Sequence, residues 1–442
     1  MRILSLICLI LHVATSAQNS VTGTFIPAEN FSYALLYKAT PEGAEYIDRG
    51  SLDRNGSFSI ALNDTVSPGI YKIVYALPPE ENNFDFIYNG KENIDFEFST
   101  KDGVIFKDSN ENKLWSSYLR SIAMVNQTIS NYYAQEHIDE AAFNAIFKTL
   151  SDTQNAYEES AKDLLVSNFI VANRPYIPES FEDLSTYSMN VKENYLKHID
   201  YDNYILQCSS FLKEHVLSYV FDMVSNASND TYKNLVNDVV QSMEHSNLVI
   251  RTNLLAQLWQ RFAEINKANL ANYVTDLYLL DLATSLNMTY LKERILAYKN
   301  TSVGAKAPNF EVSLNDNKTT LHNLNAKDYY LLIFWSSSCG HCLGELPEVK
   351  KVVESIANIQ VIAFALEDDD EGWSKEKINY PNFTHVLGLG KWENEVVKRY
   401  DISATPTYFI LNSDKKIIGK PYDFKDLAEA LDQLQKENTQ KN

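Results

Sequence analysis

The chain has 442 residues, a formal net charge of −19 at pH 7 and four cysteines. Its length predicts about three domains, since a domain commonly holds about 100–200 residues. The acidic charge argues against nucleic-acid binding, because contacts to phosphate require a basic surface. Four cysteines are too few for a fold that depends on a disulfide scaffold.

Residues 1–17 have the layout of a secretory signal peptide. Arg2 supplies an early positive charge, Ile3–Val13 is apolar, and small residues lead to a cleavage site after Ala17. The apolar run is shorter than the about 20 residues that a membrane anchor needs. Cys8 lies inside this run, has no lipidation context and is removed with the signal. We therefore expect a mature protein of the periplasm or cell envelope that does not span the membrane.

Residues 18–107 are predicted to form a β-rich domain. Turn signals such as Asn55-Gly56 and Asn89-Gly90 separate short runs rich in Tyr, Phe, Ile and Val. In Ile94–Phe98, apolar and acidic residues alternate, as in a strand with one buried face. An antiparallel sandwich or small barrel is the fold that this pattern favours. The predicted strand runs are Ser32–Ala39, Gly56–Leu62, Gly69–Leu77, Asn83–Gly90 and Glu92–Thr100.

Residues 108–300 are predicted to be helical. Apolar residues recur at three- and four-residue spacing in Asn112–Leu119, Thr231–Met243 and Thr252–Asn266, and Arg174–Pro178 is a clear break. Cys208 falls on an apolar stretch, where we expect an inert buried thiol. The histidines of this region lack the spacing of metal ligands; they are His137, His198, His215 and His245.

Tyr329–Pro347 reads YYLLIFWSSSCGHCLGELP and predicts a strand, a turn and a helix. Seven apolar or aromatic residues indicate a strand that is buried on both faces of its sheet. Cys339 falls at the start of the helix, where free N–H groups and the helix dipole favour a thiolate. Cys342 follows one turn later and can close a disulfide with it. His341 between them lowers the thiol pKa further when it is protonated.

Two other kinds of site compete with redox chemistry at this pair. A zinc site needs about four ligands, but no second C-x-x-C pair follows and His385, the next histidine, stands alone. A structural disulfide would close too short a loop to constrain the unfolded chain much. Redox chemistry is therefore the favoured interpretation, with no metal and no cofactor.

The motif F-W-x-x-x-C-G-H-C-x-x-E-x-P, together with Tyr400–Leu411, resembles the thioredoxin superfamily and specifically its extracytoplasmic TlpA-like branch. The resemblance covers residues 301–442 and implies an α/β thioredoxin-like fold there. Residues 18–107 resemble the β-rich domain that often precedes such a module in envelope proteins of Bacteroidetes. Further elements are expected in the last domain: a hairpin after Val303, a buried strand at Ile359–Leu366, a solvated acidic loop at Glu367–Glu371, a helix at Asn394–Tyr400, a hairpin through Lys415–Lys420 and a helix from Phe424.

The resemblance also implies roles for individual residues. Cys339 is the attacking thiol and Cys342 the resolving one. Pro406 matches the cis proline that thioredoxin-like folds place opposite the cysteines, and its tertiary amide makes the cis form accessible. Thr405 before it is expected to offer backbone groups to a bound polypeptide, and Trp335 is predicted to contact the substrate.

Two positions depart from the family pattern. Ile333 stands where many thioredoxins carry a buried aspartate, and Ser338 stands where they carry tryptophan before the first cysteine. TlpA-like reductases instead resemble this chain in having a glutamate after the second cysteine, here Glu345. Glu345 is predicted to accept a proton from Cys342, the alternative being an ordinary carboxylate on the helix surface.

The predicted function is an extracytoplasmic thiol-disulfide oxidoreductase acting on protein disulfides. Gly340-His341 is the dipeptide typical of protein disulfide isomerases, whereas TlpA-like relatives often reduce substrates with electrons from a membrane thiol donor. Reductase and isomerase activity both fit. One alternative is a thiol peroxidase, although the P-x-x-x-T-x-x-C pocket of that class is missing here. Another is an envelope binding protein whose redox domain is accessory.

Overall fold

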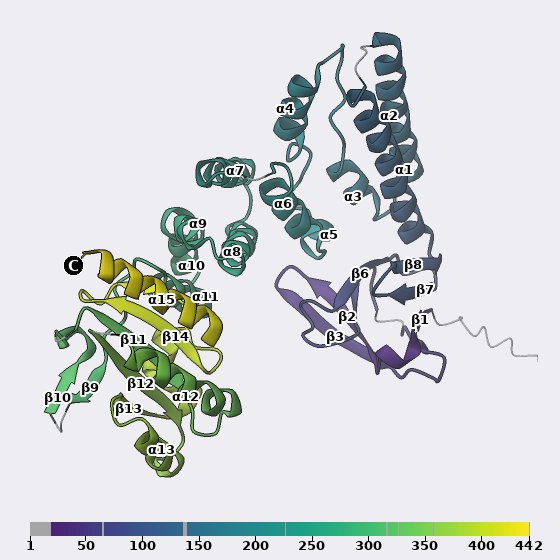
Figure 1. Ribbon diagram of the computed structural model, residues 1–442. Coiled ribbons are helices and arrows are strands. Elements are labelled where there is room, and N and C mark those ends of the chain that lie inside the picture. Colours follow the sequence, from purple (N-terminus) through teal and green to yellow (C-terminus); the bar gives the residue numbers. More distant parts are fainter. Residues whose placement is uncertain are drawn as a thin grey trace, which may run out of the picture. The chain divides into compact units, whose positions relative to one another are not determined.

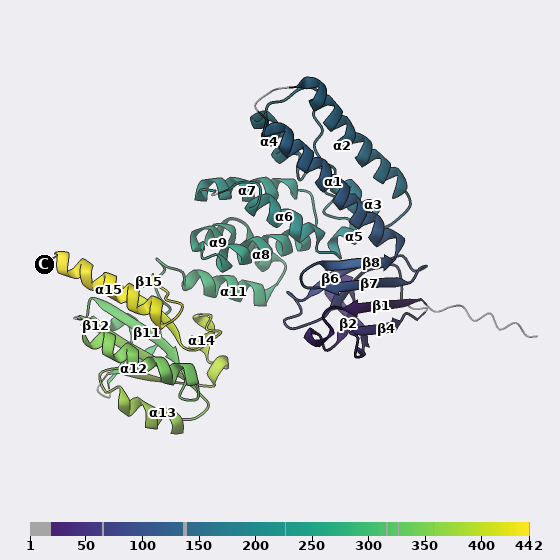
Figure 2. The same cartoon turned by 45° about the vertical axis from the view of Figure 1, so that its right-hand side comes forward.

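The computed structural model describes residues 19–63, 66–135, 139–225, 227–314, 317–325, 327–356 and 358–441. The predicted signal peptide, Cys8 and His137 lie outside these residues. The chain divides into two compact units between Gln257 and Leu258 (Figures 1 and 2). In the described part of the chain, no helix has the length and apolar character required to cross a membrane.

The first unit begins with a sandwich of two four-stranded sheets. One sheet has the strand order β4-β1-β7-β8 and the other β3-β2-β5-β6, and all neighbours are antiparallel except β1 and β7. The predicted β-rich fold is therefore confirmed, and three further strands, β1, β3 and β8, join the predicted runs. The strands are β1 (Ser20–Phe25), β2 (Ala34–Thr40), β3 (Gly43–Gly50), β4 (Ser57–Ala61), β5 (Gly69–Val74), β6 (Asn83–Tyr88), β7 (Ile94–Ser99) and β8 (Gly103–Asp108).

Aromatic side chains fill the space between these two sheets. In β7, Ile94, Phe96 and Phe98 are buried while the acidic residues between them are half-exposed, as the alternation predicts. The phenyl rings of Phe25 and Phe58 lie 5.3 Å apart in the same core. The turn at Gly56 has φ +79°, and a Cβ there would lie 2.4 Å from the Phe25 carbonyl oxygen. Only glycine therefore fits this turn without strain.

Helices follow the sandwich, as predicted. Asn112 near the start of α1 joins them to it, because its side chain accepts a hydrogen bond from Ile87 N (2.8 Å) and donates one to Ile87 O (2.7 Å). Cys208 directly follows α5 and is buried, and burial raises the pKa of its thiol. The helices are α1 (Asn110–Tyr133), α2 (Glu140–Ser160), α3 (Ser167–Ala172), α4 (Leu184–Asn194), α5 (Tyr204–Gln207), α6 (Phe211–Phe221), α7 (Asn229–Ser242) and α8 (Leu248–Glu264).

The second unit starts within α8 and combines short helices with an α/β domain. The helices before the domain are α9 (Ala268–Val274), the π-helical turn Thr275–Leu279, α10 (Leu280–Ser285) and α11 (Thr289–Asn300). The domain's helices are α12 (Gly340–Glu354), α13 (Glu371–Glu376), α14 (Glu395–Arg399) and α15 (Phe424–Lys441). Its strands are the β9–β10 hairpin (Glu311–Leu314 and Asn317–Thr320) and β11 (Tyr329–Trp335), β12 (Ile359–Glu367), β13 (Thr384–Leu389), β14 (Thr407–Asn412) and β15 (Ile417–Gly419).

The central sheet of this domain has the order β13-β12-β11-β14-β15. Strands β11, β12 and β13 are parallel, whereas β14 and β15 are antiparallel to their neighbours. This is the thioredoxin-like α/β fold that was predicted for the region. The family resemblance covered residues 301–442, while the compact unit also takes in the helices from Leu258 onward.

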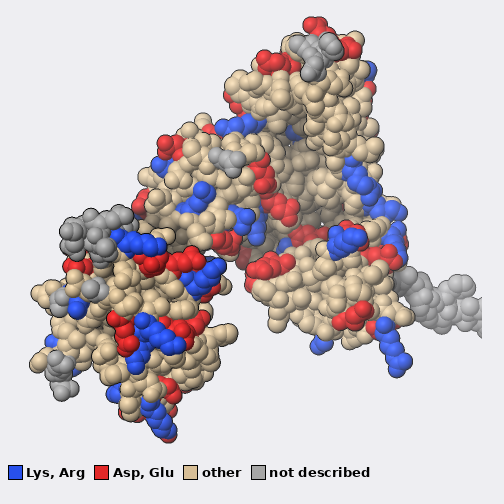
Figure 3. Space-filling view, in the orientation of Figure 1, with Lys and Arg blue, Asp and Glu red and all other residues tan. Residues whose placement is uncertain are grey.

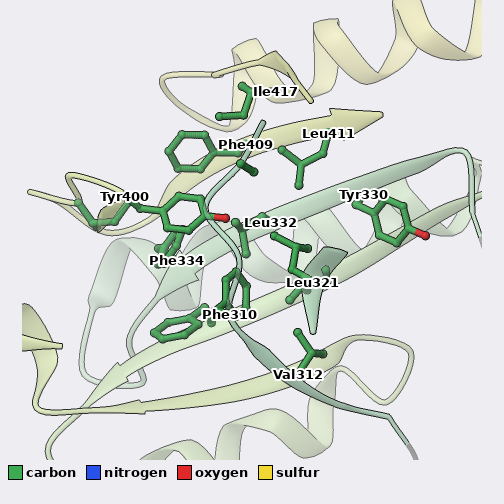
Figure 4. Close-up of a cluster of buried hydrophobic side chains, with 14 of the residues drawn as sticks. Phe310, Val312, Leu321, Tyr330, Leu332, Phe334, Tyr400, Phe409, Leu411 and Ile417 are labelled. Atoms are coloured by element: carbon green, nitrogen blue, oxygen red, sulfur yellow. The ribbon is translucent and has the colours of Figure 1, made fainter. Parts of the chain in front are cut away.

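Strand β11 is buried on both faces, which explains its continuous apolar sequence. Tyr330, Leu332 and Phe334 face a cluster that includes Phe310, Tyr400 and Phe409 (Figure 4). Leu331, Ile333 and Trp335 face the opposite cluster, in which side chains of α12 and α15 pack together. A short loop joins β11 to α12, so the first turn of α12 lies at the carboxyl end of β11.

Acidic and basic side chains are interspersed on the face of the molecule seen in Figure 3. Several pairs are close enough to form ion pairs on exposed helices, for example Lys148 with Asp152 (2.7 Å) and Lys375 with Glu371 (2.9 Å). Exposed pairs of this kind contribute at most about 1 kcal/mol to stability.

Candidate functional site

Cys339 is the N-cap residue of α12, at the position that the sequence predicts. Its backbone is extended, with φ −90° and ψ 111°, and its Sγ accepts a hydrogen bond from the backbone N–H of Cys342 at 3.2 Å. The short loop before it is closed by Cys339 N donating to Ser336 O at 3.1 Å. The sulfur thus occupies the place of a capping oxygen, facing the unpaired N–H groups of the first turn.

The two cysteines of the pair are free thiols in different surroundings. Cys339 is partly exposed, and burial opposes its ionisation. Hydrogen bonds that its sulfur accepts from Cys342 and from the backbone N–H of His341 outweigh this effect, so the pKa of Cys339 is lowered. Cys342 is fully buried, and burial together with its hydrogen bond to the Cys339 sulfur raises its pKa to about 12. One sulfur is thus prepared to ionise and the other to stay protonated.

Thr405 and Pro406 lie against Cys339, 66 and 67 positions further along the chain. The Thr405–Pro406 peptide bond is cis, as predicted. The Cys339 thiol donates a hydrogen bond to Thr405 O at 3.3 Å, and both Thr405 and Pro406 are half-buried. The structure therefore brings together Cys339, Cys342, Thr405 and Pro406, four of the five residues that the sequence assigned to attack, resolution and substrate contact.

Glu345 has a partner that the sequence analysis missed. The hydroxyl of Tyr408 donates a hydrogen bond to Glu345 Oε2 at 2.7 Å. Tyr408 is fully buried, and its pKa is strongly raised, first by burial and then by the neighbouring Glu345 carboxylate and the two cysteines. The sequence held one signal for this partner. Side chains alternate between the two faces of a strand, so Tyr408 lies on the same face as Pro406, two residues before it.

The prediction that Trp335 contacts the substrate does not fit the structure. Its side chain is fully buried in the cluster that contains Cys342 and Leu346, and its Nε1 has no hydrogen-bond partner among the described residues. Trp335 is the last residue of β11 and faces α12, together with Ile333. Its role is therefore to pack beneath the cysteine pair.

The expectation that Glu367 belongs to a solvated loop is also wrong. Glu367 is the last residue of β12 and is 5% exposed. Its Oε1 accepts a hydrogen bond from the backbone N–H of Ser337 at 2.5 Å. This carboxylate fixes the loop that leads into Cys339, whereas the three aspartates after it are exposed. A local acidic run gave no sign that its first member pairs with a segment 30 residues away.

Within the described ranges, no group of three or more His, Cys, Asp or Glu side chains is placed to hold a metal ion. His341 is exposed on the first turn of α12. His385 lies on β13, where its Nε2 is within 2.9 Å of the Tyr380 carbonyl oxygen.

Comparisons with known proteins concern the same region. A model of the AhpC/TSA family matches residues 303–420. The thiol-disulfide oxidoreductase ResA of Bacillus thuringiensis (strain Al Hakam) is 25% identical over 142 residues, which span 32% of this chain and 81% of that protein. ResA of Bacillus subtilis (strain 168) is 25% identical over 148 residues, spanning 32% of this chain and 78% of that protein.

A solved domain of a possible thiol-disulfide isomerase from Cytophaga hutchinsonii is 32% identical. The match covers 31% of this chain and 96% of that domain, with a TM-score of 0.27. The family model and the ResA relatives agree on the region that holds the cysteine pair. Residues 303–420 of this chain thus belong to a thioredoxin-like domain of the AhpC/TSA family, homologous to the ResA thiol-disulfide oxidoreductases.

Proposed function

We propose that this protein is an extracytoplasmic thiol-disulfide oxidoreductase that acts on protein disulfides through Cys339 and Cys342. The observation that carries the proposal is the asymmetry of the pair. Cys339 caps α12, is partly exposed and has a lowered pKa, while Cys342 is buried and its pKa is raised to about 12. Disulfide exchange requires this division between an accessible attacking thiolate and a protected resolving thiol.

In the reducing direction, the Cys339 thiolate attacks one sulfur of a substrate disulfide. The substrate S–S bond breaks, one substrate thiolate leaves, and a mixed disulfide with Cys339 remains. Cys342 then gives up its proton, and its sulfur attacks Cys339 Sγ and releases the second substrate thiolate. The protein ends with a Cys339–Cys342 disulfide, having transferred two electrons. An external dithiol must reduce this disulfide before the next cycle.

The proton of Cys342 requires an acceptor, because the raised pKa keeps this thiol protonated at neutral pH. Glu345 lies one helical turn beyond Cys342 and is half-buried, so a transfer can run directly or through a water. Its carboxylate is held by Tyr408 from the facing strand. We assign Glu345 as the acceptor and Tyr408 as the residue that positions it.

The place of action rests on the sequence of residues 1–17, which predicts export. A periplasmic or envelope location would supply cystine-containing proteins as substrates and a membrane thiol donor as the source of electrons. Both partners are part of this proposal. Detection of the mature protein, cleaved after Ala17, in an envelope fraction would support it.

The activity is tested with the purified mature protein, insulin as the polypeptide disulfide and a dithiol as the donor. We expect insulin reduction well above the rate with the dithiol alone, and loss of that rate in Cys339→Ser. No turnover above the donor, in a protein whose C-terminal domain is folded, would contradict the proposal. A comparable rate of hydrogen peroxide consumption would instead favour the thiol peroxidase.

A further inference from the structure

A groove of about 860 Å3 lies beside the cysteine pair, within the unit that begins at Leu258. Part of its lining comes from the active-site elements: His341 and Glu345 of α12 and the stretch Thr405–Phe409. A second part comes from residues that precede the matched family region, namely Asn266, Ala268, Tyr298 and Ser302. Further lining comes from Lys420–Asp423 and Asp426. The helices before the domain thus contribute directly to the surface next to the cysteines.

These helices are fixed against the domain. Ile295 of α11 is fully buried, and so is Thr301 at the end of that helix. Backbone hydrogen bonds then join the following segment to β15: Gly304 N donates to Ile417 O (2.7 Å), and Ile417 N donates to Ala305 O (2.8 Å). Buried side chains and paired backbone of this kind make the wall a defined part of the groove.

Tyr298 is the aromatic side chain that α11 contributes to the lining. The Lys420 ammonium lies 5.7 Å from the centre of its ring and 5.2 Å from the centre of the Phe409 ring, within the range of cation–π contacts. The indole of Trp259 packs edge-on to the same ring at 5.4 Å. Tyr298 is thus held in place between α8 and the sheet while one side of it lines the groove.

We propose that Tyr298 and its neighbours on the preceding helices extend the substrate surface of the domain, and that they select substrates by binding the polypeptide segment that flanks a cystine. A small disulfide needs only the end of the groove at Thr405, which Cys339 contacts. The remaining volume, with mixed polar and apolar lining and Tyr298 and the 88% exposed Tyr422 at its sides, suits a peptide chain. The inference rests on the oxidoreductase activity proposed above.

The test compares a polypeptide disulfide with a small one in the full-length mature protein. Tyr298→Ala should lower kcat/KM for insulin about fivefold or more, mainly through a higher KM, since truncating an aromatic anchor weakens binding by about that factor. Reduction of hydroxyethyl disulfide should stay within about twofold of the unaltered protein. The matched control is Tyr290→Ala, because Tyr290 is on the same helix, 78% exposed and outside the groove lining.

Ala268→Gln is the second variant, in case Tyr298→Ala fails to fold. Ala268 is the first residue of α9, where glutamine is tolerated, and the longer side chain would occupy the groove. It should raise the KM for insulin and not that for hydroxyethyl disulfide. Unchanged insulin kinetics in the folded variants, or an equal loss with both substrates, would overturn the inference. If the unaltered protein reduces neither disulfide, the proposed oxidoreductase activity itself is wrong.

Discussion

The clearest prediction concerns the order in which the two active-site thiols react with iodoacetamide. A pKa of about 12 leaves about 10⁻⁴ of Cys342 as thiolate at pH 8. The pKa of Cys339 is lowered from 9, so at least about a tenth of it is ionised there, a ratio of about 10³. A thiolate is more nucleophilic when the pKa of its thiol is higher, by about 20-fold for a pKa difference of about three. Cys339 should therefore still react at least about 50-fold faster, before access is considered.

The rate at which iodoacetamide labels each thiol should rise with pH. A thiol reacts as its thiolate, so labelling of Cys339 should be present above its pKa and be lost as the pH falls through that value. The midpoint of the pH dependence for Cys339 should lie below 9, because its pKa is lowered from that of an unperturbed thiol. Labelling of Cys342 should become appreciable only as the pH approaches 12.

The assay is timed alkylation of the reduced protein, followed by peptide mapping with mass spectrometry. Cys208 is an internal control, because it is buried and its pKa is raised by that burial. In Cys339→Ser, labelling of Cys342 should remain slow at pH 8. Labelling of Cys342 before Cys339, or at a rate within a few-fold of it, would refute the assigned roles.

Three further predictions follow from the contacts of the site. Cys342→Ser should accumulate mixed disulfides with envelope proteins and Cys339→Ser almost none, as seen by non-reducing gels and mass spectrometry; equal trapping would refute the division of roles. Glu345→Gln should shift the pH profile of insulin reduction with the fold intact, and Tyr408→Phe should shift it in the same sense, whereas Tyr400→Phe, which loses a hydroxyl bonded to Pro308 O, should not. An unchanged pH profile in Glu345→Gln would show that Glu345 is not the proton acceptor but an ordinary carboxylate of the helix. Glu367→Ala should lower the free energy of unfolding in urea by about 1–3 kcal/mol, because Ser337 loses a charge-assisted hydrogen bond, and a cost no larger than that of exposed Asp370→Ala would argue against it.

Local sequence patterns were sufficient to predict where the cysteine pair lies in the fold. A continuous apolar run, a short polar turn and a C-x-x-C spacing place Cys339 at the start of a helix, and the structure has it as the N-cap of α12. The β-rich, helical and α/β regions were also predictable, since hydrophobic period distinguishes them. Strand β3 was not predicted, because nearly all of its residues are exposed and its sequence therefore shows no alternation of apolar and polar residues.

Two contacts of the site depend on pairing between distant strands, and sequence patterns do not record which strands pair. Tyr408 reaches Glu345 because β14 pairs with β11 in the register that sets Tyr408 opposite Ile333. Glu367 reaches Ser337 because β12 pairs with β11 on its other side. Trp335 was misassigned for a related reason. An apolar strand buried on both faces does not reveal which face the following helix covers.

The direction of the three central strands explains why these segments meet at one place. β11 and β12 are parallel, so the loop before Cys339 and the terminal Glu367 lie at the same edge of the sheet. β14 runs antiparallel to β11, so its beginning, not its end, lies at that edge; Thr407 pairs with Phe334. Pro406 and Thr405 precede Thr407 and therefore come to lie against the N-terminus of α12. The mixed sheet thus places the start of α12, the Glu367 carboxylate and the cis-proline loop together, although they are up to 67 residues apart, from Cys339 to Pro406.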